Sequence, residues 1–337
     1  MEVDPNPDWP IERVEVRDSH RGPKAWASYL ALRFAQATLG RLPRGMRAFG
    51  AGLVARLAEV IDRRHSAAAL DYVGSAMPEL SAKERRKLVR QSWVHLVDMA
   101  LTAPFAARAL MGKKVGDCVD VRMTEDAREL IEKGSPSILM GCHVGHWEVA
   151  GLLHSTMGFD PVFAVAKAPR NDPLSRYMQR TREQQGGRLL PQLDAMKSVP
   201  AAIRGGGSIM FMLDHRPRRK PVFAPFFGRP AACGRSAGIL LRRVGAPIVF
   251  YSCCRSSGDR PFELLYGPVL QPEELAGLNP TEVATRINQV YEVLIRRHPE
   301  QYLWLHDRFR RMPKTWEALE RAQAKGLEYP FPRTELE

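Results

Sequence analysis

The sequence is poor in cysteine, and its cysteines are not arranged in pairs. Among 337 residues there are five, with no Cys-x-x-Cys spacing: Cys118, Cys142, Cys233, Cys253 and Cys254. A disulfide framework or a zinc ribbon needs paired cysteines, so neither is predicted. We expect a protein that works in a reducing compartment.

Long apolar runs are also missing. Residues 1–22 are acidic and broken by prolines, so they do not resemble a secretory signal, and we expect the protein to stay inside the cell. The first apolar stretch, Trp26–Leu39, contains Arg33. As a helix it would cover only about 21 Å of the ~30 Å hydrocarbon layer, so it cannot span a membrane. It either packs as an amphipathic core helix or lies along a membrane surface.

One catalytic signature is absent. The chain has no His-Glu-x-x-His pattern, which argues against a zinc protease. An apolar fraction of 45% and a charged fraction of 26% are ordinary for a globular protein. Composition alone therefore names no activity.

Negative charge is in deficit. The 50 Lys and Arg residues outnumber the 37 Asp and Glu residues, which gives a net charge of +13. A surface of this kind attracts anionic lipid, an acidic carrier protein or nucleic acid. The basic residues are not interleaved with aromatic ones as stacking platforms for bases require, so nucleic acid is not predicted as a partner.

The apolar pattern changes once along the chain. Helical periodicity dominates residues 24–112, and Ser81 with Glu84 has the spacing of a capping box. From residue 113 to 312, short apolar strands alternate with helices, which predicts a mixed, mostly parallel α/β sheet covered by helices on both faces. We expect residues 1–23 to form an irregular N-terminal segment and residues 313–337 a C-terminal tail.

Polar residues follow three of the predicted strands. His143 follows residues 137–141, Asp214 follows residues 208–213, and a basic helix containing Arg182 follows residues 161–167. In open α/β sheets the site lies at the carboxyl ends of the strands, so these residues are predicted to converge.

The segment Gly141–Ala150, GCHVGHWEVA, carries the candidate chemistry. If His143 lies in a turn and Glu148 in the helix that follows, Gly145 allows a bend that brings the carboxylate to one imidazole nitrogen. The other nitrogen is then a general base for a hydroxyl, and backbone amides near Val144–His146 or a nearby arginine can stabilise an oxyanion. This equipment suits acyl transfer to an alcohol.

Other interpretations of these histidines remain. His143, His146, Glu148 and His154 could suggest a metal site, but their spacing matches no known metal pattern, so no metal is predicted. We interpret His146 as a neighbour of the base and His154 as a core histidine. A metal-dependent hydrolase is the less favoured alternative.

Four ordered blocks carry a resemblance to a family. His143-x-Gly145-x-Trp147-Glu148 resembles the His-x4-acid motif of the glycerolipid acyltransferase superfamily, in the form found in lipid A late acyltransferases. Residues 167–183, 211–231 and 298–313 are similar to further blocks of that family, including its Pro-Phe-Phe-Gly loop and its Pro-Glu-Gln-Tyr-Leu-Trp-Leu-His block. The match covers nearly the whole chain.

The resemblance implies an enzyme on the cytoplasmic face of the inner membrane, peripheral or monotopic, with an N-terminal helical membrane-associating region. It would move a fatty acyl group from acyl-acyl carrier protein or acyl-CoA to a hydroxyl of a lipid A precursor, with no cofactor. The implied partners are the acyl carrier protein, a glycolipid acceptor and an anionic membrane surface.

The resemblance also assigns roles to residues. His143 would be the base and Glu148 its partner, whereas Arg182 and Asp214 would position substrate or structure the site. The further substrate-binding candidates are Gly145, His146, Lys167, Phe226, Phe227 and Gly228. For the Phe226–Gly228 loop, a packed turn is the alternative.

The chain also departs from the family pattern. His146 stands where relatives commonly have Asn, and His215 where they have Gln. Another glycolipid, such as an inositol mannoside, is therefore the alternative acceptor.

Overall fold

The computed structural model describes residues 19–110, 113–167, 169–184, 187–192, 195–217, 220–306 and 308–325. Residues 1–18 and 326–337 lie outside the described residues, so most of the expected N-terminal segment and the end of the expected tail are not placed. The remainder of that tail contains a helix, α13 (Trp316–Ala324).

Helices alone form the N-terminal part, as expected from the sequence. They are α1 (Pro23–Thr38), the short η1 (Leu39–Arg41), α2 (Arg44–Ile61), α3 (Arg63–Ala76) and α4 (Ala82–Leu110). Pro43 separates η1 from α2. The predicted capping box at the start of α4 is confirmed, because the Ser81 amide donates to the Glu84 carboxylate (2.8 Å) and the Glu84 amide donates to the Ser81 hydroxyl (3.4 Å).

Strands and helices then alternate. The first half contains α5 (Val115–Cys118), β1 (Val119–Met123), α6 (Glu125–Glu132), β2 (Ile138–Gly141), α7 (Trp147–His154), η2 (Ser155–Phe159), β3 (Val162–Ala166), α8 (Asp172–Glu183), β4 (Arg188–Pro191), α9 (Ala195–Arg204) and β5 (Ser208–Met212). The second half contains β6 (Pro221–Phe226), β7 (Arg229–Gly234), α10 (Arg235–Val244), β8 (Ile248–Arg255), β9 (Phe262–Leu270), α11 (Pro272–Ala276), α12 (Pro280–Arg297) and η4 (Pro299–Gln301).

Seven strands form one mixed, mostly parallel sheet, which confirms the predicted fold class. Their order is β1-β9-β8-β2-β5-β3-β4. The five strands from β8 to β4 run in one direction, whereas β9 is antiparallel to β8 and β1 is parallel to β9. The carboxyl ends of β2 and β5, which are neighbours, therefore lie at the same edge of the sheet.

Helices cover both faces of this sheet. Ile138 and Met140 of β2 pack in a cluster with α9, α10 and α12, whereas Leu139 packs in a second cluster with α6 and α7. All four residues of β2 are buried, because a central parallel strand has an apolar neighbour on each face. This central position explains why the strand is a short apolar run in the sequence.

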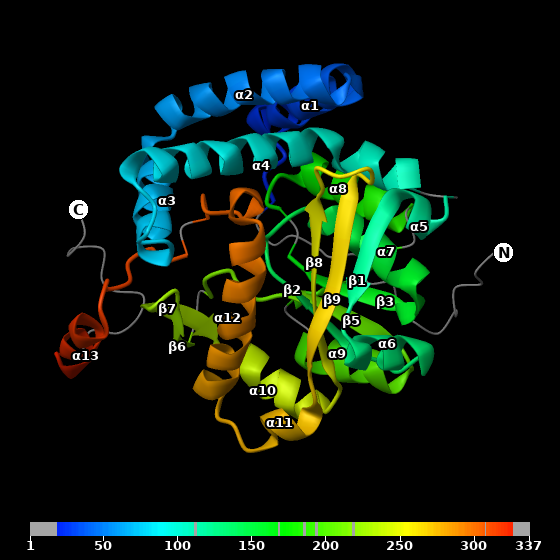
Figure 1. The fold of residues 1–337 in the computed structure, drawn as a ribbon, viewed down its shortest axis with the longest axis vertical. Helices are drawn as coiled ribbons and strands as arrows, with labels where there is room; N and C mark the ends of the chain where they lie inside the picture. The colour runs from blue at the N-terminus through cyan, green and yellow to red at the C-terminus, as the bar shows by residue number, and fades with distance from the viewer. Residues whose placement is uncertain are drawn as a thin grey trace.

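Helices α1 and α2 lie along one end of the molecule, with α4 between α2 and the sheet domain (Figure 1). Helix α1 also contacts α8 of the sheet domain directly. Residues of α4 contact α2 on one side and α7 and η4 on the other. Among the residues that the structure places, no helix combines the length and the apolar character needed to cross a bilayer.

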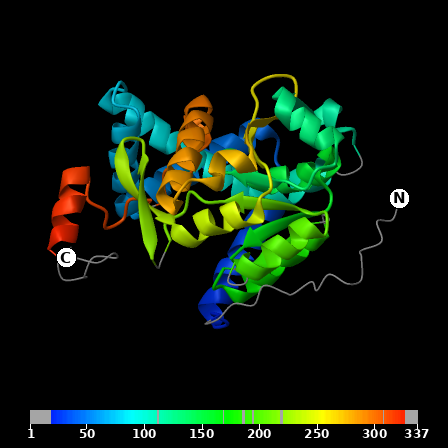
Figure 2. The ribbon, with the colours of Figure 1, turned by 90° about the horizontal axis from the view of Figure 1, so that it is seen from below.

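The sequence pattern did not predict the hairpin β6–β7, which lies between Asp214 and α10. The two strands pair antiparallel from Pro221 opposite Gly234 to Phe226 opposite Arg229. The hairpin packs against α12 and α13, and α13 lies at the outer edge of the molecule (Figure 2). Prolines at 221 and 225 had obscured the strand.

Candidate active site

His143 lies in a tight turn between β2 and α7. Gly145 in this turn has φ +70°, and a Cβ atom there would collide with the carbonyl of Cys253 on β8. A left-handed backbone and a close approach both require glycine. Gly145, a substrate-binding candidate, thus has a backbone role in shaping the turn.

The backbone of this turn is tied to two neighbouring segments. The Gly145 amide donates to the Gln301 carbonyl (3.0 Å), the His146 amide donates to the Cys253 carbonyl (2.6 Å), and the Val144 amide donates to the Cys142 carbonyl (2.7 Å). All three amides are therefore occupied. The expectation that amides of Val144–His146 stabilise an oxyanion is wrong for this reason.

Asp214 is the carboxylate that contacts His143. Its Oδ1 lies 2.7 Å from His143 Nδ1, and its Oδ2 accepts from the His143 amide (2.9 Å). Although burial favours the neutral acid, the charge and hydrogen bonds of His143 outweigh it, so the pKa of Asp214 lies well below its usual value. An ionised Asp214 fixes the proton of a neutral His143 on Nδ1 and leaves Nε2 as the proton acceptor.

Glu148 has a different partner from the one predicted. Arg182 of α8 donates to it from Nη2 (2.6 Å) and Nε (3.0 Å), which is a bidentate ion pair between α7 and α8. The predicted His143–Glu148 pair is therefore wrong: Asp214 occupies Nδ1 of His143, and Arg182 binds Glu148. The predicted convergence at the strand ends does hold for His143 and Asp214.

Aromatic rings enclose the His143 imidazole. Trp147 meets it edge-on at 5.0 Å between ring centroids, and His215 stacks on it at 3.9 Å with an angle of 3° between the planes. His306 stacks in turn on His215 at 4.0 Å. The sequence singled out His215 only as a departure from the family pattern.

Two further histidines are buried. His146 and His154 are both 0% exposed, and burial lowers the pKa of each to about 3. His154 Nδ1 lies 2.7 Å from the Tyr266 hydroxyl, which confirms our interpretation of a core histidine. Both ring nitrogens of His146 lack a hydrogen-bond partner among the described residues. His146 is thus a neutral neighbour beneath the turn.

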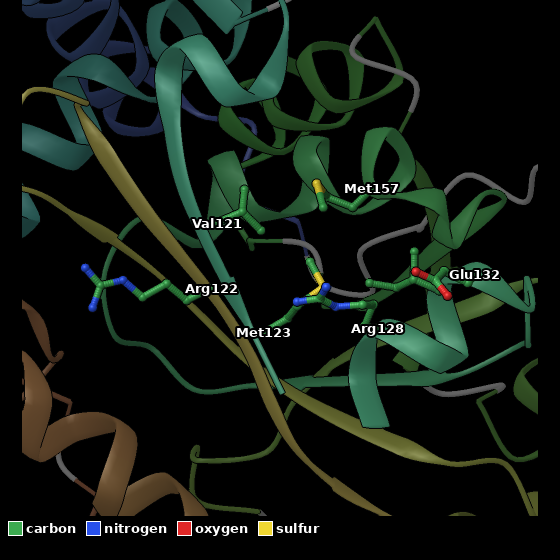
Figure 3. Close-up of a pocket in the computed structure, with 7 residues that line it drawn as sticks. Val121, Arg122, Met123, Arg128, Glu132 and Met157 are labelled. Atoms are coloured by element: carbon green, nitrogen blue, oxygen red, sulfur yellow. The ribbon is translucent and has the colours of Figure 1, made fainter. Parts of the chain in front are cut away.

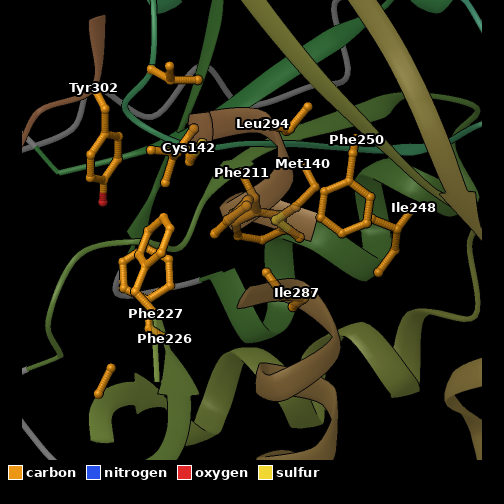
Figure 4. Packing of buried hydrophobic residues seen from close by; sticks show 14 of the residues in the cluster. Met140, Cys142, Phe211, Phe226, Phe227, Ile248, Phe250, Ile287, Leu294 and Tyr302 are labelled. Atoms are coloured by element: carbon orange, nitrogen blue, oxygen red, sulfur yellow. The ribbon is translucent and has the colours of Figure 1, made fainter. Parts of the chain in front are cut away.

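The remaining substrate-binding candidates are Lys167 and the loop Phe226–Gly228. Phe226 and Phe227 are 1% and 6% exposed and belong to the main apolar cluster, with Phe211 and Ile287 (Figure 4). Phe227 and Gly228 both have positive φ, as a two-residue hairpin turn requires. This loop has the packed-turn geometry. Lys167 is exposed just after β3.

One open pocket of about 570 Å³ lies elsewhere (Figure 3). Its walls come from β1, α6 and η2, and include Met123, Arg128 and Met157. Because β1 runs antiparallel to β2, this pocket is at the opposite edge of the sheet from His143. No predicted site residue lines it.

A metal centre was the other interpretation of the histidines. The described part of the chain holds no group of three or more His, Cys, Asp or Glu side chains placed to share a metal ion.

Sequence reasoning missed two residues that support the turn. His95 of α4 contacts the Gly145 carbonyl through Nε2 (2.9 Å), and Tyr302 pairs as a β-bridge with Val144. Burial, followed by the negative charge of Asp214, raises the pKa of the Tyr302 hydroxyl. Tyr302 lies in the Pro-Glu-Gln-Tyr block, so that block could have pointed to it. His95 lies on α4 outside every motif block of the sequence.

Comparison with known proteins agrees with the geometry. Residues 14–311 match the family described as bacterial lipid A biosynthesis acyltransferase. The palmitoleoyltransferase of lipid A biosynthesis in Escherichia coli (strain K12) is 23% identical over 293 residues, 86% of this chain and 93% of its own. The lauroyltransferase of the same organism is 27% identical over 240 residues, 70% and 76% of the two chains, and its myristoyltransferase is 24% identical over 295 residues, 86% and 89%.

A histidine braced by an aspartate at the carboxyl ends of β2 and β5 thus lies inside a match that covers most of the chain. The chain belongs to the bacterial lipid A biosynthesis acyltransferases, and it is an acyltransferase of EC class 2.3.1.

Proposed function

We propose that this acyltransferase moves a fatty acyl group from acyl-acyl carrier protein, or from acyl-CoA, to a hydroxyl of a lipid A precursor, with His143 as the general base. The observation that carries this proposal is the 2.7 Å contact between His143 Nδ1 and Asp214, because it leaves Nε2 for the acceptor hydroxyl. Asp214 takes the role of orienting carboxylate that the sequence had given to Glu148.

The reaction runs through a tetrahedral intermediate. The acceptor oxygen attacks the thioester carbonyl carbon while its proton passes to Nε2 of His143. The C–S bond then breaks, and the departing sulfur takes the proton from the imidazolium. Asp214 stabilises the positive charge that His143 carries between the two steps.

The oxyanion needs a donor other than the turn's amides. Arg182 is the candidate, because Glu148 uses two of its five N–H groups and holds the guanidinium in one orientation. Its side chain is 27% exposed, so substrate can reach it. A donor of this kind contributes about 3 kcal/mol to the transition state.

Helices α1 and α2 carry the proposed membrane contact, on the cytoplasmic face of the inner membrane. Their exposed apolar side chains recur at helical spacing: Trp26, Leu30, Phe34, Met46, Phe49, Leu53, Val54, Leu57, Val60 and Ile61. Elsewhere in the described chain only Ile239 and Val293 are large, apolar and exposed. Such a face, with exposed Lys24, Arg41 and Arg56 beside it, suits helices that lie in the interface of an anionic leaflet.

The net charge of +13 supports an acidic acyl carrier protein as donor, because opposite charges speed encounter. The acceptor stays in the leaflet that α1 and α2 contact.

The test is a direct transfer assay. Purified protein is incubated with acyl carriers of several chain lengths, with acyl-CoA, and with lipid A precursors or inositol mannosides in mixed micelles, and the products are identified by mass spectrometry. We expect an ester on the lipid A precursor and at least about 1,000-fold less product from His143→Ala. Full activity of that variant would refute the base, and product only on another glycolipid would refute the acceptor.

A further inference from the structure

Helix α4 reaches the catalytic turn with two side chains. His95 Nε2 lies 2.9 Å from the Gly145 carbonyl, and one helical turn earlier the Ser92 hydroxyl donates to the Tyr302 carbonyl (2.6 Å). Gly145 and Tyr302 belong to the two segments that pair through the Val144–Tyr302 bridge. Residues three apart on a helix face the same way, so both bonds come from one face of α4.

The contact of His95 defines its protonation. Burial lowers the pKa of His95, so the ring is neutral at neutral pH. A carbonyl can only accept, so the neutral ring must carry its proton on Nε2 and donate it to Gly145. The Gly145–His146 peptide is then held at both ends, by His95 at its carbonyl and by the Cys253 carbonyl at its amide.

The turn has little room to adjust otherwise. Gly145 is pressed against β8, and the His143 carbonyl accepts from the Leu303 amide (2.9 Å). A shift of the 145–146 peptide would therefore move His143 relative to Asp214. Displacements of about 1 Å in a catalytic group cost on the order of 100-fold in rate.

The same face of α4 is held further along the helix by a shared carboxylate. Asp98, one turn beyond His95, accepts from Arg47 of α2 (2.6 Å) and from Arg255 at the end of β8 (2.6 Å). Helix α4 is thereby fixed to α2 and to the strand that carries Cys253. Its position relative to the turn is set by half-buried ion pairs as well as by apolar packing.

We propose that His95 is a positioning residue for the transfer reaction: its Nε2–H holds the Gly145 carbonyl and so sets the place of His143 beside Asp214. Ser92 supports the paired segment at Tyr302. The inference rests on the proposed function of His143, but it concerns a residue outside the family's motif blocks.

The test compares two substitutions of His95. His95→Gln keeps an N–H donor at similar reach, whereas His95→Leu removes it and keeps an apolar side chain. We expect His95→Leu to lower kcat about 10- to 100-fold with KM changed less than about threefold, and His95→Gln to stay within about threefold of the native kcat. Ser92→Ala is expected to fall between them. His65→Leu on α3, whose ring contacts Asp62, is the matched control.

A second readout does not depend on activity. The Nδ1 proton of His143, shared with Asp214, is followed by NMR at low field in each folded variant. We expect it to shift or broaden in His95→Leu and to keep its native position in His95→Gln. A native kcat and an unchanged proton signal in folded His95→Leu would overturn the inference. Equal losses of kcat in His95→Leu and His95→Gln, in proportion to the fall in their melting temperatures, would also overturn it. If native protein transfers no acyl group, the proposed function fails, and the proton signal still decides the role of His95.

Discussion

Asp214 and Glu148 were both candidates to pair with His143, but they contact different groups. Asp214 holds His143 by two contacts, whereas Glu148 holds Arg182 by two contacts. The first pair governs which nitrogen of His143 carries the proton. The second governs where a guanidinium points. Their removal should therefore leave different signatures.

Asp214→Asn is expected to lower kcat by about 1,000-fold or more, because an amide no longer fixes the tautomer or stabilises the imidazolium. Glu148→Gln is expected to weaken transfer through Arg182. In a double-mutant cycle, Glu148→Gln and Arg182→Lys should be strongly non-additive in kcat/KM.

The NMR signal of the His143 Nδ1 proton separates the two cases. It should disappear in Asp214→Asn and persist in Glu148→Gln. Loss of the signal only in Glu148→Gln would restore the pairing that the sequence had suggested.

Burial of His146 lowers the stability of the fold at low pH. Its ring is buried and neutral, with a pKa of about 3, whereas an unfolded histidine titrates near 6.5. Between pH 3 and pH 6.5, His146 binds a proton in the unfolded chain but not in the folded chain. The contribution to stability is thus fully present above pH 6.5 and declines as the pH falls toward 3.

His146→Asn, with the residue common in relatives, should remove this dependence. Between pH 7 and pH 5 we expect the free energy of unfolding of native protein to fall about 2 kcal/mol more than that of the variant. Urea unfolding at the two pH values measures the difference. An equal fall in both proteins would mean that the folded His146 accepts a proton.

Single residues were partly predictable. His143, Asp214 and Arg182 were singled out because each follows a predicted strand, and parallel strands bring their ends together. The partner of His143 was not predictable from spacing, since Asp214 is 71 residues away and Glu148 is five away. The partner of His143 is the carboxylate at the end of the neighbouring strand β5, not the carboxylate nearest in sequence.

At the scale of elements, α1 and α2 differ from the other helices in what they expose. Phe34, Phe49 and Ile61 are 72%, 71% and 74% exposed, although burial of each would be favourable. Both helices nevertheless pack on α4 through their other faces. Their outward faces are therefore available to lipid.

Replacing Leu53 and Leu57 by Glu should detach the protein from membranes. Each leucine lies on the exposed face of α2, and loss of its apolar contact plus repulsion from anionic lipid should weaken vesicle binding about 10-fold or more per position. Co-sedimentation with anionic and with zwitterionic vesicles measures it.

Val293→Glu on α12 is the matched control, since Val293 and Leu57 are both 60% exposed. Equal effects of the control and of the α2 substitutions would argue against a specific membrane face. If native protein bound tightly to zwitterionic vesicles but not to anionic ones, the basic residues would have no role in membrane binding.

Elements were predicted better than their details. The helices and the seven-stranded sheet follow from periodicity, because each segment has a clear apolar face or a short buried run. The hairpin β6–β7 was missed since prolines and a basic stretch masked its alternation. The Phe226–Gly228 turn belongs to that hairpin, so its packing could not be anticipated either.

At the scale of the whole molecule, α4 connects two functions. One side of it carries α1 and α2, with their proposed lipid contact, and the other bonds the turn that holds His143. No spacing in the sequence predicts such a connection, because it depends on contacts between α4 and residues 50 or more positions away.

The fit of Gly145 against the Cys253 carbonyl has an evolutionary consequence. A side chain at residue 145 would collide with the backbone of β8, so we expect residue 145 to remain glycine while acyl length or acceptor changes. Among descendants of this enzyme, substitutions should therefore accumulate in side chains that contact lipid, while the turn that holds His143 stays unchanged.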